Sequence, residues 1–484
     1  MGSATTAASS TPTPPVAAIR AAIAELLDVD LTDVTRDLGI HQLPEWSSID
    51  HIRLMSGLED RFGCVIDGDA VRRLTTVDAI EMFLAGAKPL DEPDGPADDA
   101  PPPERVAVRR GLADVYVDTS SVTAIDGSRG SLRIRGYDID DLVAHGSFEE
   151  ALHLVLSGER PSPADVARIR RMMGATDDGL DAAVAVVRAL ASAHPVVALR
   201  SAVSAIGTAG PGSSATSGAQ IRATAVEMVA TLHVLLAHHH AVRRGEPLGH
   251  RGPADASVAE QTMRLHADRP PTAVEIEAMD LMLTIGVDHG ANASAFAARV
   301  TASAGTDLPG AIVTALSTFA GELHGGAADG VLSTLREIGH PNAAQAHVDR
   351  LRGQREPVMG FGHRVYRTQD PRVAPLRTMA HRLCARADHR HLLHTMTALE
   401  QAMADSARHG LAINVDPYLA LITHMLGFPD DYGTAIYAMS RAVGWCAHVA
   451  EQVDARVLIR PRLGYNGPAA RRWGTAPAAD GGAR

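Results

Sequence analysis

Apolar residues recur at spacings of three and four along most of the chain, which is the period of helices with one buried face. This pattern predicts amphipathic helices over residues 180–193, 224–243, 274–287, 311–320 and 432–454. One short extended segment is expected in the stretch SLRIRGYDIDDL, and Gly158 and Pro161 are stop signals for the helices that follow it. The large part of the chain is therefore predicted to be nearly all helical.

Two polar, Pro-rich segments lack this period and divide the chain. Residues 1–15 are predicted to be a disordered N-terminus, and the acidic stretch 86–104 is predicted to be a linker. Between them, residues 16–85 show helical spacing in VAAIRAAIAELL and IDHIRLMSGLEDRF, which predicts a small helical module. A large domain is expected over residues 105–470, and a flexible tail over residues 471–484.

Composition and charge exclude several classes of function. The formal net charge of −12 disfavours nonspecific nucleic-acid binding, which needs a basic surface. The three cysteines, Cys64, Cys384 and Cys446, lie far apart, so neither a disulfide framework nor a zinc site is predicted. The N-terminus lacks the features of a secretion signal, and no apolar stretch reaches the roughly 20 residues that span a bilayer. A cytoplasmic protein that binds neither nucleic acid nor membrane is expected.

Three histidines stand beside glycine or an expected helix start: His289 in VDHGANAS, His324 in GELHGGAADG and His363 in GFGHRVYRTQDPR. In such places the backbone approaches closely, and main-chain N–H groups can hold an imidazole. Taken singly, each is more simply explained as a structural or surface residue. Asp416, in NVDPY, lies between apolar residues where partial burial would favour a catalytic base, and a helix N-cap is the alternative.

Together and in order, eight motifs resemble the successive motifs of citrate synthases: RGYDIDDL, HPVVALRSAVSAIG, DHGANAS, ELHGGA, GFGHRVYRTQDPR, NVDPY, SRAVGWCAHVAEQ and IRPRLGYNGP. The resemblance implies a mainly α, citrate-synthase-like fold with large and small helical domains, assembled as a homodimer. It also implies a transferase that condenses an acyl thioester, such as acetyl-CoA, with oxaloacetate or a related 2-oxo acid, and then hydrolyses the thioester to give a tricarboxylic acid.

The same resemblance implies a role for each catalytic candidate. Asp416 would remove a proton from the carbon beside the thioester carbonyl. His324 would donate a hydrogen bond to the resulting enolate oxygen, and His363 would polarise the ketone of the 2-oxo acid.

Carboxylate binding is assigned by resemblance to His289, Arg372, Arg441 and Arg460, the last donated by the other subunit. For Arg372 or Arg441 considered alone, an ordinary surface or interdomain salt bridge is the alternative. No metal is expected, because the three histidines stand on separate motifs beside arginines that would repel a cation.

Three positions depart from the family pattern: Gly290 replaces Glu, Ala328 replaces Asn, and Pro417 replaces Phe after the expected base. A changed side chain at position 417 would reshape the acyl pocket. The resemblance therefore does not name the acyl group.

The segments LPEWSSIDHIRLMSGLEDRFGCVI and RLTTVDAIEMFL resemble acyl carrier proteins, which implies a small helical bundle ahead of the large domain. Ser48 would carry 4′-phosphopantetheine added by a phosphopantetheinyl transferase, although Ser47 replaces the usual Asp before it. The alternative is that Ser47 or Ser48 simply caps the following helix. A modified module could supply a tethered thioester in place of free coenzyme A.

A second class of function is also compatible with these domains. In this alternative, a non-catalytic helical dimer presents the carrier-like module to other enzymes, and the histidine and arginine site only senses a carboxylate.

Overall fold

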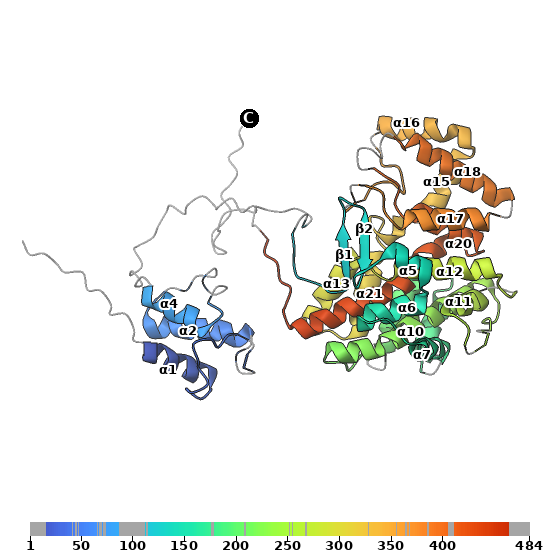
Figure 1. Ribbon diagram of the computed structural model, residues 1–484. Coiled ribbons are helices and arrows are strands. Elements are labelled where there is room, and N and C mark those ends of the chain that lie inside the picture. Colours follow the sequence, from blue (N-terminus) through green and yellow to red (C-terminus); the bar gives the residue numbers. More distant parts are fainter. Residues whose placement is uncertain are drawn as a thin grey trace, which may run out of the picture. The chain divides into compact units, whose positions relative to one another are not determined.

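A computed structural model describes residues 16–40, 42–43, 46, 48–64, 66, 70, 74–86, 112, 115–175, 179–207, 210–250, 252–253, 255–266, 269–327, 329–354, 356–363, 365–366, 368–384, 387–404 and 411–463 (Figure 1). The chain divides into two compact units, Met1–Ala107 and Val108–Arg484. The predicted N-terminus 1–15, nearly all of the predicted linker 86–104, the tail 471–484 and Ala328 lie outside the described residues.

The first unit contains the helices α1 (Val16–Leu27), α2 (Ser48–Phe62) and α4 (Val77–Gly86). Buried apolar residues of all three helices form one core. Because helices this short are only marginally stable alone, packing around this core stabilises them. Trp46 lies fully buried just before α2, and its indole N–H donates to Nδ1 of His51 at 3.1 Å. The predicted small helical module is therefore a unit with a core of its own.

The second unit is built mainly of helices: α5 (Ile139–His145), α6 (Phe148–Ser157), α7 (Pro163–Ala175), α8 (Asp181–Ala189), α9 (Pro195–Ile206), α10 (Gly218–Arg244), α11 (Val258–His266), α12 (Ala273–Gly286), α13 (Ala293–Ser303), α14 (Leu308–Phe319), α15 (Asp329–Ile338), α16 (Ala344–Gln354), α17 (Val373–Leu383), α18 (Ala387–Ala402), α20 (Asp416–Met425) and α21 (Gly433–Ala455). The prediction of a mainly helical fold is confirmed. Gly158 ends α6 in the left-handed conformation, as its position predicted.

A small antiparallel sheet precedes these helices, with strand order β1 (Thr123–Asp126), β2 (Ser131–Ile134) and β3 (Tyr137–Asp138). The sequence predicted one extended segment, which contains β2 and β3. The prediction was incomplete because β1 has four residues without a clear alternation of buried and exposed positions.

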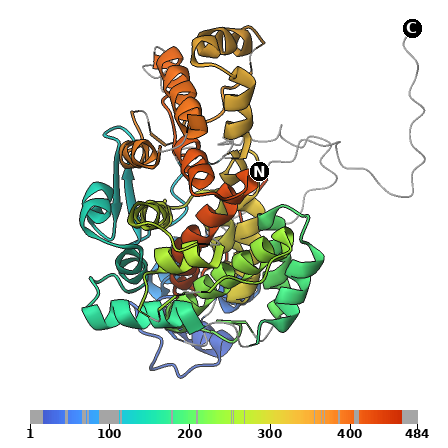
Figure 2. The same cartoon turned by 90° about the vertical axis from the view of Figure 1, so that its right-hand side faces the viewer.

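Two groups of helices form two lobes in both views of the second unit (Figures 1 and 2). Helices α15 to α18 and α20 pack on one another and form the smaller lobe. Helices α5 to α14 pack around α21 and form the larger lobe. This arrangement agrees with the predicted division into large and small helical domains.

The centre of the large lobe is a pair of long helices, α10 and α21. Every residue of α21 from Gly433 to Ala450 is buried, as expected for a helix that is apolar on all sides. Helix α10 has the length and apolar composition that could cross a membrane, but 72% of its apolar stretch is buried inside this unit. It is therefore placed as a core helix.

Helix α21 approaches the chain that follows α12 at Gly444. The main-chain N–H of Gly444 donates to the carbonyl oxygen of Val287 at 2.9 Å. A Cβ atom on Gly444 would lie 2.2 Å from Oδ1 of Asp288 and 2.6 Å from the Val287 carbonyl oxygen, so no side chain fits. This close approach positions the segment that continues to His289.

We expect Gly444→Ala to lower the free energy of unfolding by roughly 1–3 kcal/mol, because the new methyl group must push buried main-chain atoms apart. The matched control is Gly433→Ala on the same helix, where a Cβ would meet only Thr423 Oγ1 at 3.7 Å. Denaturant titration of both variants measures the difference. Equal stability of the two variants would contradict the close approach.

Candidate active site

His289 lies three residues after the end of α12, in the segment that α21 contacts. It is buried, and its Nε2 lies 3.1 Å from the hydroxyl of Tyr366. The ring of His363 meets it edge to face at a centroid distance of 5.4 Å. Burial holds the pKa of His289 far below its usual value, and the charges of Arg372 and Arg441 lower it further. His289 is therefore a neutral imidazole at the junction of two predicted motifs.

His363 is held by the main chain of its own loop. Its Nδ1 accepts hydrogen bonds from the backbone N–H groups of Val365 at 3.0 Å and Tyr366 at 3.1 Å. Backbone N–H groups only donate, so Nδ1 carries no proton and the neutral ring is protonated on Nε2. Burial, and then the charge of Arg372, lowers the pKa of His363 to about 4. The side chain is thus a neutral hydrogen-bond donor at neutral pH.

His324 is held in a related way between α14 and α15. The backbone N–H of Ser294 lies 3.3 Å from its Nε2, and the Ser294 hydroxyl lies 2.9 Å from the same atom. Trp445 in turn donates its indole N–H to that hydroxyl at 3.1 Å. Burial, and then the charge of Arg441, lowers the pKa of His324 to about 4. Because Nε2 accepts from the backbone, the proton of the neutral ring lies on Nδ1.

The prediction that backbone N–H groups hold the histidines is confirmed for His324 and His363.

Arg372 and Arg441 are both buried, so a surface salt bridge is wrong for each, and an interdomain salt bridge stays an alternative. Arg372 pairs with Asp370 through Nε at 3.0 Å and Nη2 at 2.7 Å. Arg441 donates through Nε to the carbonyl oxygen of Gly286 at 2.7 Å. Burial opposes ionisation of Asp370, but the Arg372 charge holds the pKa of that carboxyl below its usual value.

Tyr437 joins the two arginines. Its hydroxyl oxygen accepts from Nη1 of Arg372 and from Nη2 of Arg441, both at 3.0 Å. The Arg441 guanidinium also lies 5.0 Å from the centre of the Tyr437 ring, in a cation–π contact. With both oxygen lone pairs used, the hydroxyl proton of Tyr437 is directed elsewhere in the site.

Asp416 is the first residue of α20. The cap position belongs to Val415, and no side-chain hydrogen bond caps the helix there, so the alternative role of Asp416 as an N-cap is wrong. Its backbone N–H instead donates to Oδ1 of Asn414 at 3.0 Å. The Asp416 side chain is partly exposed.

The loop before Asp416 is joined to the loop that carries His363. Phe361 and Ile413 form an antiparallel β-bridge. Asn414 donates its backbone N–H to the Gly360 carbonyl at 3.0 Å, and Gly362 donates to the Ala412 carbonyl at 2.8 Å. The candidate base and the candidate ketone-polarising histidine thus belong to one hydrogen-bonded pair of loops in the small lobe.

Two departures from the family pattern have local explanations. Gly360 has a φ of +84°, and a Cβ there would lie 2.3 Å from Cγ of Pro417, so the proline ring packs directly on this glycine. Gly290 has a φ of +60°, in the left-handed region that favours glycine over Glu. Both changes therefore fit the backbone on which they occur.

Two predicted site residues are not joined to this group. Arg460 lies exposed after the end of α21, in a segment without regular secondary structure, and within the described part of this chain it makes no hydrogen bond or ion pair with the other site residues. Ser48 belongs to the first unit, where it is the first residue of α2. Their roles stay predictions.

Four residues of this site were not predicted from the sequence: Tyr366, Asp370, Tyr437 and Ser294. Two of them had a usable signal, because Asp370 stands two residues before Arg372, and Tyr437 stands one helical turn before Arg441.

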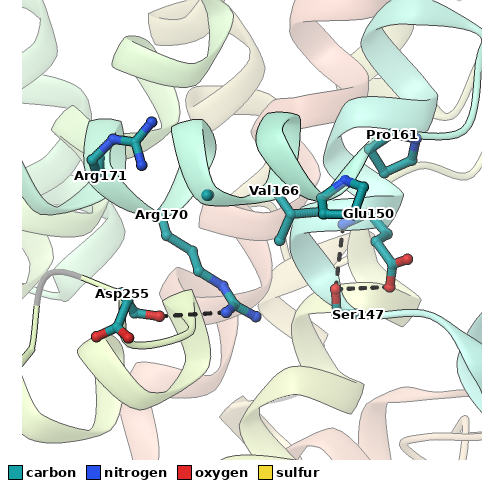
Figure 3. Close-up of a pocket in the computed structure, with 9 residues that line it drawn as sticks. Ser147, Glu150, Pro161, Val166, Arg170, Arg171 and Asp255 are labelled. Atoms are coloured by element: carbon teal, nitrogen blue, oxygen red, sulfur yellow. Dashed lines mark hydrogen bonds between the residues drawn. The ribbon is translucent and has the colours of Figure 1, made fainter.

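A cavity of about 570 Å³ lies elsewhere, between α6 and α7 (Figure 3). Its lining includes Ser147, Glu150 and Arg170, and Arg170 donates to the Asp255 carbonyl at 3.3 Å. None of the predicted site residues lines it. The candidate site is therefore identified by its chemistry and not by the size of a cavity.

Comparison with known families matches this chain to the citrate synthase C-terminal domain over residues 111–462. Citrate synthase 2 of Bacillus subtilis is 33% identical over 362 residues, which are 74% of this chain and 96% of that protein. The 2-methylcitrate synthase 2 of Corynebacterium glutamicum is 34% identical over 368 residues, or 74% of this chain and 95% of that protein.

Solved structures agree. The Thermoplasma acidophilum citrate synthase, in ternary complex with carboxymethyl coenzyme A and oxaloacetate, matches with a TM-score of 0.71 at 30% identity, covering 76% of this chain and 98% of that one. The citrate synthase of Pyrobaculum aerophilum matches with a TM-score of 0.69 at 32% identity, covering 75% of this chain and 93% of that one. The matched region contains both lobes, the three histidines and the two buried arginines described above. The chain is a citrate synthase-type acyltransferase and belongs to the citrate synthase family.

Proposed function

We propose that this protein condenses an acyl thioester, such as acetyl-CoA, with oxaloacetate or a related 2-oxo acid, and then hydrolyses the thioester. The observation that carries this proposal is the pair of neutral, partly buried imidazoles of His324 and His363. Backbone N–H groups occupy one nitrogen of each ring, so the other nitrogen holds a proton ready to donate. Two preorganised neutral donors suit a reaction in which two carbonyl oxygens gain negative charge in turn.

In the first step, the Asp416 carboxylate removes a proton from the carbon next to the thioester carbonyl. The electron pair of that C–H bond moves to the carbonyl oxygen, where Nδ1–H of His324 stabilises it. Because its pKa is about 4, the His324 ring is neutral at neutral pH, so it stabilises this oxygen by donating a hydrogen bond and not as a cation. The resulting enol or enolate is the carbon nucleophile.

In the second step, this carbon attacks the ketone of the 2-oxo acid. The Nε2–H of His363 donates to the ketone oxygen as it becomes an alkoxide and then a hydroxyl. Water next attacks the thioester carbonyl, the C–S bond breaks, and the free thiol and a tricarboxylic acid leave. Imidazole and carboxylate groups supply the proton transfers, so these steps need no metal.

The carboxylates of the 2-oxo acid bind Arg372, Arg441 and the neighbouring His289. Burial strengthens such ion pairs, and the planar guanidinium groups match carboxylates in a bidentate way. Tyr437, which already accepts from both arginines, adds its own O–H as a donor to the substrate. Arg460 completes the set from the second subunit of a homodimer, which accords with its exposed position in a single chain.

The identity of the acyl group depends on the surroundings of Asp416. Pro417 fills the space above Gly360 in place of a larger aromatic ring. Similarity to citrate synthase 2 and to 2-methylcitrate synthase 2 is nearly equal, at 33% and 34% identity, and selects neither product. An acyl chain longer than acetyl is compatible with this smaller side chain.

The first unit is proposed to be an acyl carrier that is modified on Ser48 with 4′-phosphopantetheine by a phosphopantetheinyl transferase. Support comes from the start of α2 at Ser48 and from the separate apolar core of this unit. A thioester tethered to the same polypeptide reaches a high effective concentration at the large unit of that chain or of its partner. The carrier would then replace free coenzyme A as the acyl donor.

We expect Asp416→Asn to reduce kcat by at least ~10³-fold while changing the Kd for oxaloacetate by less than about threefold, because the base does not hold the carboxylates. Thiol release from acetyl-CoA and calorimetric titration with oxaloacetate measure the two quantities. Asp431→Asn, which alters a carboxylate paired with Arg243, is the control and should keep both values. Retained turnover in Asp416→Asn would remove this residue from the mechanism.

The pKa of His363 near 4 has a consequence for NMR titration. Its ring C–H resonance, assigned by its loss in His363→Asn, should not shift between pH 8 and about pH 5.5. Since the ring has its usual pKa of about 6.5 in the unfolded chain, that chain binds more protons below this pH. Folding stability should therefore fall as the pH drops from about 6.5 towards 4. A midpoint at pH 6 or above would refute the neutral-donor assignment.

Treatment of the full chain with coenzyme A and a phosphopantetheinyl transferase should add the mass of one 4′-phosphopantetheine. The addition should vanish in Ser48→Ala and persist in Ser47→Ala, because only one hydroxyl is the acceptor. Intact-mass spectrometry measures it. An unmodified wild-type chain, or loss only in Ser47→Ala, would contradict the assignment of Ser48.

A further inference from the structure

A second cluster of polar side chains lies in the small lobe, outside the residues used above. Asp388 and His389 stand in the first turn of α18, and His424 stands in the last turn of α20. One potential ligand atom from each residue lies within 4.8 Å of those of the other two. The rings of His389 and His424 meet edge to face at a centroid distance of 5.7 Å. Two imidazoles and one carboxylate therefore converge from two helices.

The orientation of His424 is fixed by a further carboxylate. Its Nδ1 lies 3.0 Å from Oδ1 of Asp430, and Asp430 is itself paired with Arg336 of α15. A histidine that ligates a metal generally donates its other ring N–H to a carboxylate in this way, which fixes the tautomer and makes the ligating nitrogen more basic. The hydrogen bond to Asp430 leaves Nε2 of His424 as the nitrogen that can bind a cation.

We propose that Asp388, His389 and His424 form a binding site for one divalent transition-metal ion, with Asp430 as the carboxylate that orients His424. Two nitrogen ligands and one oxygen ligand suit Zn²⁺ or its neighbours, and water fills the remaining position. Ligand atoms on one zinc ion lie roughly 3.3 Å apart, as Zn–N bonds of about 2.0 Å require. Because Asp388 is exposed, rotation of its side chain can close the remaining gap.

Such an ion would join α18 to α20 within the small lobe. Helix α20 begins at Asp416, and His424 follows eight residues later, roughly 12 Å along the helix axis. The ion would therefore fix the far end of the helix that carries the proposed base. The ligands lie at the start of α18 and at the end of α20 that is distant from Asp416, so this site is separate from the proposed reaction.

Isothermal titration with zinc chloride, on the full chain stripped with EDTA and desalted, tests the proposal. One Zn²⁺ should bind per chain, and saturation should raise Tm by at least ~3 °C. His424→Gln and Asp388→Asn should each weaken binding at least ~100-fold, and Asp430→Asn by about 10- to 100-fold, because it removes only the orienting carboxylate. These readouts do not involve the condensation reaction, so they stand or fall independently of the proposed function.

The control is His394→Gln, which changes an exposed histidine on the same helix that lies outside the cluster. It should bind Zn²⁺ like the wild-type protein. Titration with Co²⁺ adds a spectroscopic readout, since visible absorption of low-coordinate Co²⁺ should appear in the wild-type and His394→Gln proteins and be lost in His424→Gln. Absence of zinc binding in the wild-type protein would overturn the proposal. Wild-type affinity for Zn²⁺ in both His424→Gln and Asp388→Asn would overturn it as well. The Tm of each variant in EDTA shows whether the variant is folded.

Discussion

The candidate site depends on two guanidinium groups that are held in the interior of the protein. A buried charge costs several kcal/mol unless other groups compensate it. Arg372 is compensated by Asp370, and Arg441 donates to the carbonyl of Gly286 and the hydroxyl of Tyr437. The charge of Arg441 also interacts with that of the buried Asp288. The resulting positive potential, added to burial, keeps the neighbouring imidazoles neutral. It also leaves the site ready to accept an anion, which is the physical reason that a dicarboxylate fits the proposed function.

This arrangement requires close packing of sequence-distant segments. Helix α21 carries Arg441, and it can approach the chain after α12 only because Gly444 has no side chain. In the small lobe, a β-bridge joins the loop of His363 to the loop before Asp416. The two lobes therefore supply different parts of the chemistry: the large lobe supplies His324 and Arg441, and the small lobe supplies His363, the base and Arg372.

The proposals differ in the kind of support they have. The condensation reaction is supported by the tautomers of His324 and His363, two partly buried histidines, and by membership of the family. The carrier role of the first unit is supported by its motif and by its separate core. The metal site is supported by the convergence of His389, His424 and Asp388, with Asp430 orienting one ring. A metal ion at this site would join α18 to the end of α20 that is distant from Asp416.

The sequence by itself determined the helical fold, because the period of apolar residues reflects which helix face is buried whatever its partner. It also determined the family and the main site residues, because motifs such as GFGHRVY and DPR are contiguous in the chain. Only the tertiary structure decided which nitrogen of His324 carries its proton, since Ser294, which holds the other nitrogen, comes from a different element. The same holds for Tyr437 between the two arginines, and for His424 beside His389. Hydrogen-bond partners and charges that are far apart in sequence meet only when the chain has folded.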